Sequence, residues 1–330
     1  MTTKIFLVRH AEAEGNLFRM AHGQYDSNLT PRGYRQLHYL RERFAAVRLD
    51  AVYGSDLTRA HATASALYVP RQLPFQPLPQ LREVRLGDWE ERPWAEIKWR
   101  DPEMYRWFNQ RPDLWRVEGA EAFSTVAERT VAAVRRMAAE HPGGTVAAAS
   151  HGAALRILLG TLEGLSLREI GESGHSDNTA VSLLEVEGDA IRVVFRDDAS
   201  HVPPECSTFR RQSWYKDGGG DEDFWFIPLA AENGMVLRAM LEREESGLVA
   251  FRREGDAMRV TSYVIDPPLR GRHLGVQLLG QAVKYARRQG LWTLVLACPQ
   301  ELRGYFAQYG FESAGADMTL DLRLTIREIP

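Results

Sequence analysis

Cysteine is scarce in this chain of 330 residues, which has only Cys206 and Cys298, in different halves of the sequence. Two distant cysteines do not provide the disulfide framework of a small secreted domain, so we expect reduced thiols. Apolar runs are short: none reaches the roughly 20 residues of a membrane-spanning helix. Between Lys4 and Arg9 there are only four apolar residues, too few for a signal peptide core. We therefore expect a cytoplasmic protein with no membrane partner.

A large excess of one charge is absent too. The 41 Lys and Arg residues nearly balance the 44 Asp and Glu residues, so nothing attracts the whole chain to nucleic acid. The sequence has no HExxH segment, no paired CxxC motifs and no Walker lysine loop. His22, His175 and His201 are not spaced as metal ligands, and we interpret them as residues of a pocket rim or of the structure. We predict no metal requirement.

The length predicts about two domains. Residues 214–223 combine three consecutive glycines with acidic residues, a composition typical of a linker. We predict a first domain at 1–212, a linker at 213–223 and a second domain at 224–330. The sequence does not specify the oligomeric state.

Both predicted domains belong to the α/β class. In the first, short apolar strands alternate with helical patterns at 34–46, 60–67 and 123–140, as in a mostly parallel sheet with helices on its faces. For the second domain, the sequence predicts strands at 224–229, 247–253, 258–265 and 292–297, and helices at 273–289 and 301–309.

Three strands of the first domain are followed by basic residues. Arg9 and His10 end the apolar run 5–8, His151 follows the run 145–150, and Arg59 comes soon after 51–53. Ligands of open α/β sheets bind outside the carboxyl ends of the strands, so these side chains should converge. Two imidazoles and two guanidiniums in one pocket predict a phosphate site.

This set of residues suits phosphoryl transfer. Neutral imidazole is a nucleophile at physiological pH, a part that His10 can play. Arg9 and Arg59 match the phosphoryl oxygens in pairs, and His151 can donate to another oxygen. The leaving alkoxide needs a proton, for which Glu83 is the best candidate. The alternative for Glu83 is a solvated salt-bridge partner of the neighbouring arginines.

These residues resemble the histidine phosphatase superfamily, also called phosphoglycerate-mutase-like, over about residues 3–205. The resemblance rests on an ordered series of motifs. They are Arg9-His10, Asn16, Gly23, Asp26, Leu29 to Gly33, Gln36, Ser55 to Ala60, Thr63-Ala64, Glu83, Gly87 to Glu90 and Ser150 to Gly152. It implies a three-layer α/β/α fold, with His10 as the phosphorylated nucleophile. Arg9, Arg59 and His151 would form the phosphate pocket, Glu83 would be the proton donor, and Asn16, His22 and Gly23 would contact phosphate or substrate.

Several positions depart from the family pattern. Ala11 and Ala13 replace a glycine and a threonine, Met20 replaces an arginine, and His22 replaces a glutamine. These changes concern substrate contacts more than the phosphohistidine. The chain is also too short for the insert that phosphoglycerate mutases carry, which favours a hydrolase of a small phosphorylated metabolite over a phosphotransferring mutase.

The interval between Trp89 and Trp115 concentrates five of the eight tryptophans among arginines and lysines. Such residues could stack on an aromatic leaving group. The alternative, which we favour, is a helical cap whose aromatic residues form a core. Either way, we expect this interval to border the site.

In the second domain, the strand at 258–265 leads into a turn that opens a long helix, an anion site to which a pyrophosphate is suited. The sequence resembles the GNAT acetyltransferases, with Arg270 and Gly275 in an RxxGxG pattern and Gly310-Phe311 as the later pair. The resemblance implies binding of acetyl-CoA. The backbone around Tyr263 and Ile265 would hold pantetheine. The pyrophosphate would lie at Arg270, Gly271, Arg272, His273, Leu274, Gly275 and Val276.

The GNAT pattern is incomplete. His273 replaces its central glycine, and Phe306 stands where many members have a tyrosine that protonates the thiolate. Tyr305 is the candidate acid, although it lies about 100° round the helix. The segment before residue 247 is short for the helices that shape an acceptor pocket. Two interpretations stay open: a bifunctional enzyme with N-acetyltransferase activity, or a phosphatase with a non-catalytic module for acyl-CoA sensing or association.

Overall fold

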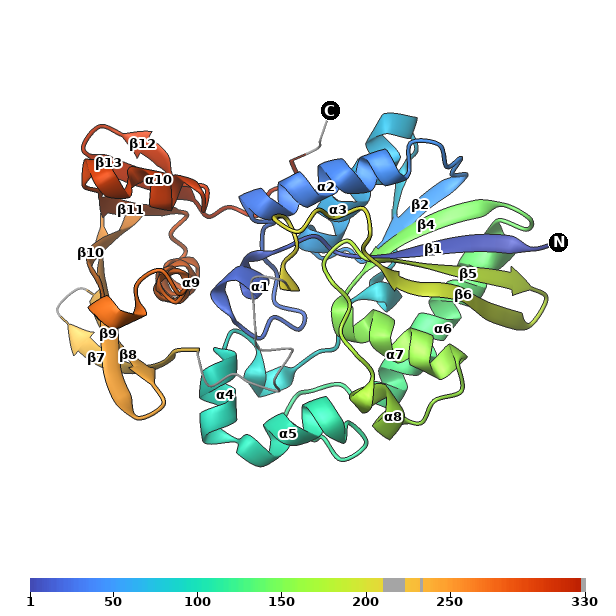
Figure 1. The fold of residues 1–330 in the computed structure, drawn as a ribbon, viewed down its shortest axis with the longest axis horizontal. Helices are drawn as coiled ribbons and strands as arrows, with labels where there is room; N and C mark the ends of the chain where they lie inside the picture. The colour runs from blue at the N-terminus through green and yellow to red at the C-terminus, as the bar shows by residue number, and fades with distance from the viewer. Residues whose placement is uncertain (210–222, 232–233, 328–330) are drawn as a thin grey trace.

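The computed structural model describes residues 1–209, 223–231 and 234–327. Within these residues, a six-stranded and a seven-stranded sheet define two α/β units that lie side by side (Figure 1). The predicted linker, apart from Asp223, lies outside the described residues, and the domain limits stay a prediction. None of the described helices is both long and apolar enough to cross a membrane.

The first unit contains the sheet with strand order β3-β2-β4-β1-β5-β6, in which β1 to β4 are parallel and β5 and β6 are antiparallel. Its strands are β1 Thr3–Arg9, β2 Ala51–Gly54, β3 Phe75–Pro77, β4 Thr145–Ser150, β5 Val181–Glu187 and β6 Ala190–Asp198. Its α-helices are α1 Glu14–Phe18, α2 Pro31–Arg43, α3 Thr58–Tyr68, α4 Trp94–Arg100, α5 Pro102–Gln110, α6 Phe123–Glu140, α7 Gly152–Leu162 and α8 Leu167–Glu172.

Helices cover both faces of this sheet. One core joins α2 and α3 to strand residues such as Val8 and Val52. The other joins α6 and α7 to Ile5, Leu7 and Val146. The predicted three-layer α/β/α architecture is therefore confirmed. Helix α2 begins three residues earlier than predicted, because Thr30 accepts a hydrogen bond from the Gly33 amide (3.0 Å) and caps the helix.

The second unit has strand order β12-β13-β11-β10-β9-β8-β7. Its strands are β7 Trp225–Ala231, β8 Gly234–Leu241, β9 Glu244–Glu254, β10 Ala257–Ile265, β11 Thr293–Ala297, β12 Glu312–Ala314 and β13 Asp317–Asp321. Its α-helices are α9 Gly275–Arg288 and α10 Arg303–Ala307. The sequence patterns missed β8. Strands β10 and β11 are parallel and are joined through α9, which covers the sheet.

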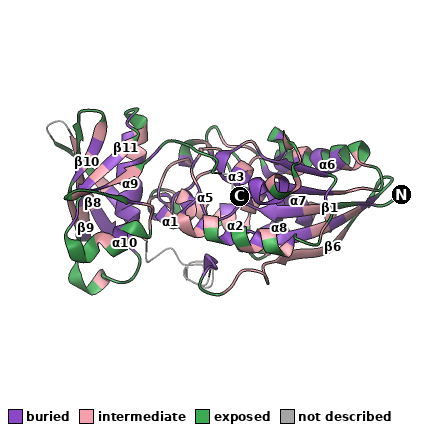
Figure 2. Ribbon diagram, turned by 90° about the horizontal axis from the view of Figure 1, so that it is seen from above, coloured by how far each residue is buried: buried purple, intermediate pink, exposed green. Residues whose placement is uncertain are grey.

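The two units share one apolar core. Phe18 and Met20 of the first unit pack with α9 and with the inner face of the second sheet. Figure 1 shows α9 between that sheet and α1, and Figure 2 shows that many residues of α9 are buried. Outside this core, Trp99 of α4 stacks on Trp225 of β7, with ring centroids 5.3 Å apart. The second unit therefore contacts the segment that follows His10 as well as the cap helices.

Candidate active site

The register of the first sheet brings His10 and His151 together. Strands β1 and β4 are parallel, and Arg9 lies opposite Ser150, so the next residue of each strand is a histidine at the same edge. Their ring centroids are 5.2 Å apart. Arg59 lies in the first turn of α3, after the neighbouring strand β2. The strand ends therefore place both imidazoles and the guanidinium of Arg59 at one edge.

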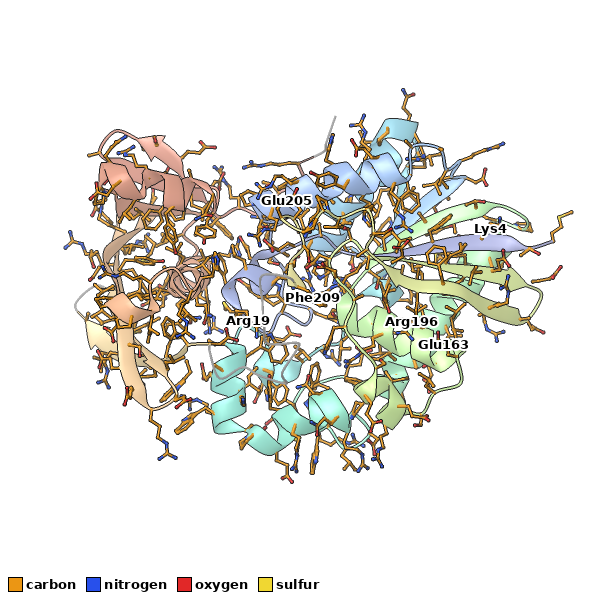
Figure 3. All side chains as sticks on the ribbon, viewed as in Figure 1. Lys4, Arg19, Glu163, Arg196, Glu205 and Phe209 are labelled. Carbon is orange, nitrogen blue, oxygen red and sulfur yellow. The ribbon has the colours of Figure 1, made fainter. Side chains whose placement is uncertain are left out.

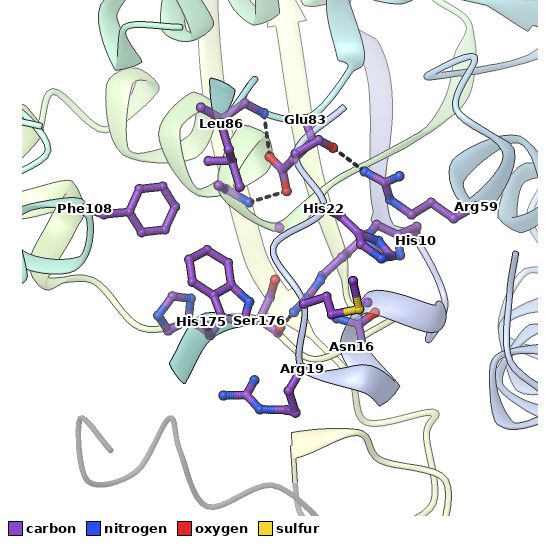
Figure 4. A pocket seen from close by; sticks show the side chains of 18 of the residues that line it. His10, Asn16, Arg19, His22, Arg59, Glu83, Leu86, Phe108, His175 and Ser176 are labelled. Carbon is purple, nitrogen blue, oxygen red and sulfur yellow. Dashed lines mark hydrogen bonds between the residues drawn. The ribbon is translucent and has the colours of Figure 1, made fainter. Parts of the chain in front are cut away.

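A cavity of about 160 Å³ lies at this edge (Figure 4). The predicted residues Arg9, His10, Arg59 and Glu83 line it. So do the predicted substrate contacts Asn16, His22 and Gly23. His151 is fully buried and is not one of the residues that line the cavity, but it lies directly beside the ring of His10. Of the two other histidines singled out, His175 lines the cavity, whereas His201 lies 3.2 Å from Arg43 instead.

The tautomer of His10 follows from one contact. Its Nδ1 lies 2.7 Å from the Ala11 carbonyl oxygen, which can only accept, so Nδ1 carries the hydrogen and Nε2 keeps its lone pair. Burial lowers the pKa of His10 well below its usual value, and the guanidiniums of Arg59 and Arg9 lower this pKa further. His10 is therefore a neutral imidazole with a free lone pair at neutral pH.

Several buried polar atoms around His10 are without a hydrogen-bond partner among the described residues. They include both ring nitrogens of His151 and the Nε atoms of Arg9 and Arg59. Arg59 is held by the carbonyl oxygens of Tyr25 (2.9 Å) and Gly23 (2.6 Å), and Arg9 donates to that of Ser176. Buried polar groups are nearly always paired in proteins. This group of donors therefore fits an anion with several oxygens.

The pKa of His151 is also well below its usual value, first because of burial and then because of Arg59 and His10. A neutral imidazole has one N–H group to donate. His151 can therefore donate to a phosphoryl oxygen without carrying a charge of its own.

Glu83 lies in the cavity wall beside the first turn of α7. Its carboxylate accepts hydrogen bonds from the amides of Val84 (2.9 Å), Ala154 (2.8 Å) and Ala153 (3.2 Å). Figure 4 shows Glu83 and His10 on the walls of the same cavity. This placement favours the proton-transfer role over the solvated salt-bridge partner.

Other residues of the site had no signal in the sequence. Asn178 donates to the His10 carbonyl (2.7 Å) and lies 3.4 Å from the Asn16 side-chain oxygen, which also accepts from the Ala13 amide (3.1 Å). It therefore fixes the backbone that follows β1. Sequence analysis also missed much of the cavity wall. The missed residues are Gly15, Arg19, Val84, Leu86, Ala153, Ser176 and Phe209, whereas Tyr105, Phe108 and Asn109 belong to the interval 89–115 that was expected to border the site.

The tryptophan-rich interval forms a core of its own and borders the cavity, whereas its stacking on a leaving group stays a prediction. Trp89 and Trp115 are buried with Phe108 and Phe123 in a core of their own, as expected of a cap. Trp94 and Phe108 also line the cavity. The cap core therefore presents some of its aromatic side chains to the site.

The second unit has a turn of unusual backbone before α9. Gly271 and His273 have φ values of 80° and 60°, in the left-handed region, and both are exposed. His273 thus adopts the conformation for which the GNAT pattern has a glycine. Strand β10 pairs with β11 only as far as Val260 and continues to Ile265, so the two strands separate near Tyr263.

Tyrosines lie where these strands separate. The hydroxyls of Tyr263 and Tyr305 are 3.0 Å apart, and both would lie 2.7 Å from a Cβ atom on Gly275. Phe306 is buried in the core of the second unit. Tyr305 therefore lies beside the start of α9, although Phe306 is the residue of α10 that points into the core.

The fold brings two histidines and two arginines to one edge of the first sheet, the arrangement that the resemblance to the histidine phosphatases predicts. Residues 5–199 match the histidine phosphatase superfamily (branch 1), and residues 189–311 match the acetyltransferase (GNAT) family. The chain belongs to the histidine phosphatase superfamily and carries a GNAT domain, which confirms both resemblances.

Individual relatives are similar to the first unit. The adenosylcobalamin/alpha-ribazole phosphatase of Escherichia coli is 33% identical over 49% of this chain and 80% of its own length. The metal-independent phosphoserine phosphatase of Arabidopsis thaliana is 30% identical over 61% of this chain and 83% of its own. The solved structure of YhfR from Bacillus stearothermophilus has a TM-score of 0.59 at 33% identity, covering 61% of this chain and all of its own.

Proposed function

We propose that this protein hydrolyses phosphomonoesters without a metal, through a phosphohistidine formed on His10. The observation that carries the proposal is a neutral His10, with its lone pair on Nε2, in a cavity with the buried side chains of Arg9 and Arg59. The names of the relatives, an alpha-ribazole phosphatase and a metal-independent phosphoserine phosphatase, support this activity. The substrate would be a small phosphorylated metabolite.

In the first step, Nε2 of His10 attacks phosphorus as the ester P–O bond breaks. Arg9, Arg59 and an N–H of His151 donate to the non-bridging oxygens, whose charge grows in the transition state. Glu83, in its protonated form, gives its proton to the departing alkoxide. In the second step, the Glu83 carboxylate takes a proton from a water molecule whose oxygen attacks phosphorus, so a P–O bond forms as the P–N bond breaks, and inorganic phosphate leaves neutral His10.

The test is phosphate release from a panel of phosphomonoesters in the presence of EDTA, together with intact mass after a brief substrate pulse. We expect release by the wild type, a transient mass gain of one phosphoryl group, and loss of both in His10→Ala. His38→Ala is the matched control, because that histidine lies on the surface with its side chain 64% exposed. Absence of release and of a phosphoenzyme in the wild type would contradict the proposal. A phosphoenzyme that transfers its group to a second alcohol rather than to water would indicate a mutase.

For the second unit, we propose that acetyl-CoA binds at the turn before α9. The backbone of Arg270 to Val276, which is exposed as far as His273 and buried from Leu274 on, would hold the pyrophosphate, and the separated strands at Tyr263 and Ile265 would admit the pantetheine. Bound acetyl-CoA supplies an activated acetyl group. The position of Tyr305 beside Gly275 supports N-acetyl transfer with this tyrosine as the acid.

A second candidate function is binding without transfer, for acyl-CoA sensing or association. The observation that favours it is the connection between β7 and β8: Ala231 pairs with Gly234, so only two residues join the strands. No acceptor-shaping helix fits in that space. Acetyl-CoA should raise the melting temperature of the wild type but not of Gly275→Ala, whose Cβ would contact both tyrosine hydroxyls. Release of CoA across an amine panel, lost in Tyr305→Phe, would support transfer, and binding without release would support the module.

A further inference from the structure

The wall of the phosphatase cavity changes character away from the phosphate end. Arg9, His10, Arg59 and Glu83 form that end, whereas the rest of the described wall combines apolar and aromatic side chains with Arg19 and neutral polar ones, namely Asn16, His22, Asn109, His175 and Ser176. The apolar and aromatic residues are Met20, Val84, Leu86, Trp94, Tyr105, Phe108 and Phe209. An alcohol attached to the bound phosphoryl group would lie against these side chains.

Arg19 is the exception in this part of the wall. Apart from the residues of the phosphate end, Arg19 is the only charged residue type, basic or acidic, among the described lining residues. The two lining histidines here, His22 and His175, are neutral near pH 7, because burial lowers the pKa of each, that of His175 to about 3. Among the described residues, Arg19 is therefore the cation that an anionic substrate group would meet in this part of the cavity.

The second unit supplies the counter-charge of Arg19. Asp223 Oδ2 accepts from both Nε (2.9 Å) and Nη2 (2.7 Å) of Arg19, and the two side chains are only 9% and 11% exposed. Figure 3 shows Arg19 and Phe209 in the middle of the molecule, between the first sheet and the second unit. A buried guanidinium bound in this way has little remaining attraction for another carboxylate.

Asp223 is in turn held by α9. Its Oδ1 accepts from the Gln277 side-chain amide (2.9 Å), and the Gln277 side-chain oxygen accepts from the Phe224 amide (2.8 Å). Gln277 is buried in the first turn of α9. The position of Asp223 opposite Arg19 is therefore fixed by the second unit.

We propose that Asp223 is a specificity residue of the phosphatase, and that the preferred substrates are phosphomonoesters of uncharged alcohols that carry an aromatic ring. The inference rests on the proposed phosphatase activity. A ring would stack or pack edge-on against Trp94 and Phe108. The carboxylate of a phosphorylated hydroxy acid or amino acid would lose its water in this cavity without gaining an unmatched cation.

The test compares three primary alkyl phosphates, so that the reactivity of the leaving group is similar. They are 2-phenylethyl phosphate, glycerol 3-phosphate and O-phosphoserine. Burial of a phenyl group corresponds to about tenfold to a hundredfold in kcat/KM. We expect 2-phenylethyl phosphate to exceed glycerol 3-phosphate by about that factor, and O-phosphoserine to be the poorest substrate.

Asp223→Asn should weaken the preference for 2-phenylethyl phosphate over esters that carry a carboxylate. It removes one carboxylate partner of Arg19, so kcat/KM for a fourth ester, 3-phosphoglycerate, relative to 2-phenylethyl phosphate should rise about tenfold, the scale of one charge-assisted hydrogen bond. Arg19→Met in the same background should abolish that rise. Glu245→Gln, which breaks an exposed ion pair with Arg238 in the same unit, should leave the ratio unchanged.

The outcomes separate this inference from the proposed function. Wild-type hydrolysis of O-phosphoserine or 3-phosphoglycerate as fast as that of 2-phenylethyl phosphate overturns the inference and leaves the phosphatase intact. An unchanged ratio in a folded Asp223→Asn variant overturns the role of Asp223. Hydrolysis of no ester at all overturns both. The wild-type comparison decides the substrate class even where a variant does not fold.

Discussion

Arg287 and Glu14 form a two-point ion pair between the units, with Nη1···Oε2 and Nη2···Oε1 distances of 2.6 and 2.9 Å. Their side chains are 8% and 13% exposed. Arg287 also donates from Nε to the Leu322 carbonyl (3.0 Å). Glu14 begins α1, and the next two residues line the phosphatase cavity. The pair therefore ties α9 directly to a wall of the first site.

Removing one partner of this pair should destabilise the protein strongly. Glu14→Gln leaves a buried guanidinium without its counter-charge, a loss of about 3–5 kcal/mol in comparable buried pairs. Urea unfolding measures it, and the double variant Glu14→Gln/Arg287→Gln should recover part of the loss. The exposed pair Arg168–Glu172 is the control, for which Glu172→Gln should cost at most about 1 kcal/mol. Equal effects at both sites would show that the interface pair is dispensable.

Gly280 of α9 gives a second measure of the contact between the units. A Cβ on this residue would lie 2.5 Å from the Phe18 Cβ, so Gly280→Ala must displace α1. We expect lower stability and a higher KM of the phosphatase, because α1 precedes Met20 and His22 in the cavity wall. Gly304→Ala in α10 is the control: nothing lies within 4 Å, and alanine should stabilise that helix by up to about 1 kcal/mol. Equal changes in stability and KM for Gly280→Ala and Gly304→Ala would contradict a role of the Gly280–Phe18 contact.

Glu83→Gln should reveal proton donation through its dependence on the leaving group. The amide keeps the size of the side chain but cannot supply the proton. The kcat for an alkyl phosphate should fall about a hundredfold to ten-thousandfold, whereas that for p-nitrophenyl phosphate, whose phenolate needs no proton, should fall much less. Equal losses for both esters would assign Glu83 to binding instead.

The buried histidines predict how activity and stability depend on pH. At pH 5.5 a histidine of ordinary pKa is about 90% protonated, but burial keeps the pKa of His10 well below its usual value, so the nucleophile stays neutral. Protonation of the nucleophile should therefore lower kcat by less than about threefold between pH 7 and 5.5. A tenfold decline with a midpoint near 6.5 would contradict this.

The free energy of unfolding, unlike the protonation state of the nucleophile, should depend on pH in this range. Below pH 6.5 the unfolded chain gains protons at His10, His22, His151 and His175, while the folded protein does not, because burial lowers their pKa values. The free energy of unfolding should thus decrease as the pH falls, by about 1.4 kcal/mol per histidine and pH unit. Urea unfolding at pH 7.5 and 5.5 checks this.

The sequence predicted the chemistry of the first site better than its walls. Arg9, His10, Arg59 and His151 stand in local patterns, an apolar strand followed by a polar residue, and strand order brings such ends together. Ser176 and Phe209 line the cavity, and Asn178 holds the His10 backbone beside it, all from segments without such a pattern. Their positions depend on tertiary packing, which a single sequence does not encode locally.

The contact between the units was also beyond prediction. Phe18, Met20 and Gly280 look like ordinary core or helix residues in the sequence, and only the structure shows that the first two pack on the helix containing the third. Strand β8 was also missed: no strand was predicted between 229 and 247, whereas in the structure β8 pairs with both β7 and β9.

Because Phe18 packs on α9, neither unit has a complete apolar core if the chain is divided between them. Each unit completes the apolar core of the other, so a piece ending at Phe209 and a piece starting at Asp223 would each expose surface that the partner normally covers. The same surface and the Arg287–Glu14 pair would hold the two pieces together once they met. Two separately synthesised halves should therefore reassemble by complementation, and each alone should be prone to aggregate.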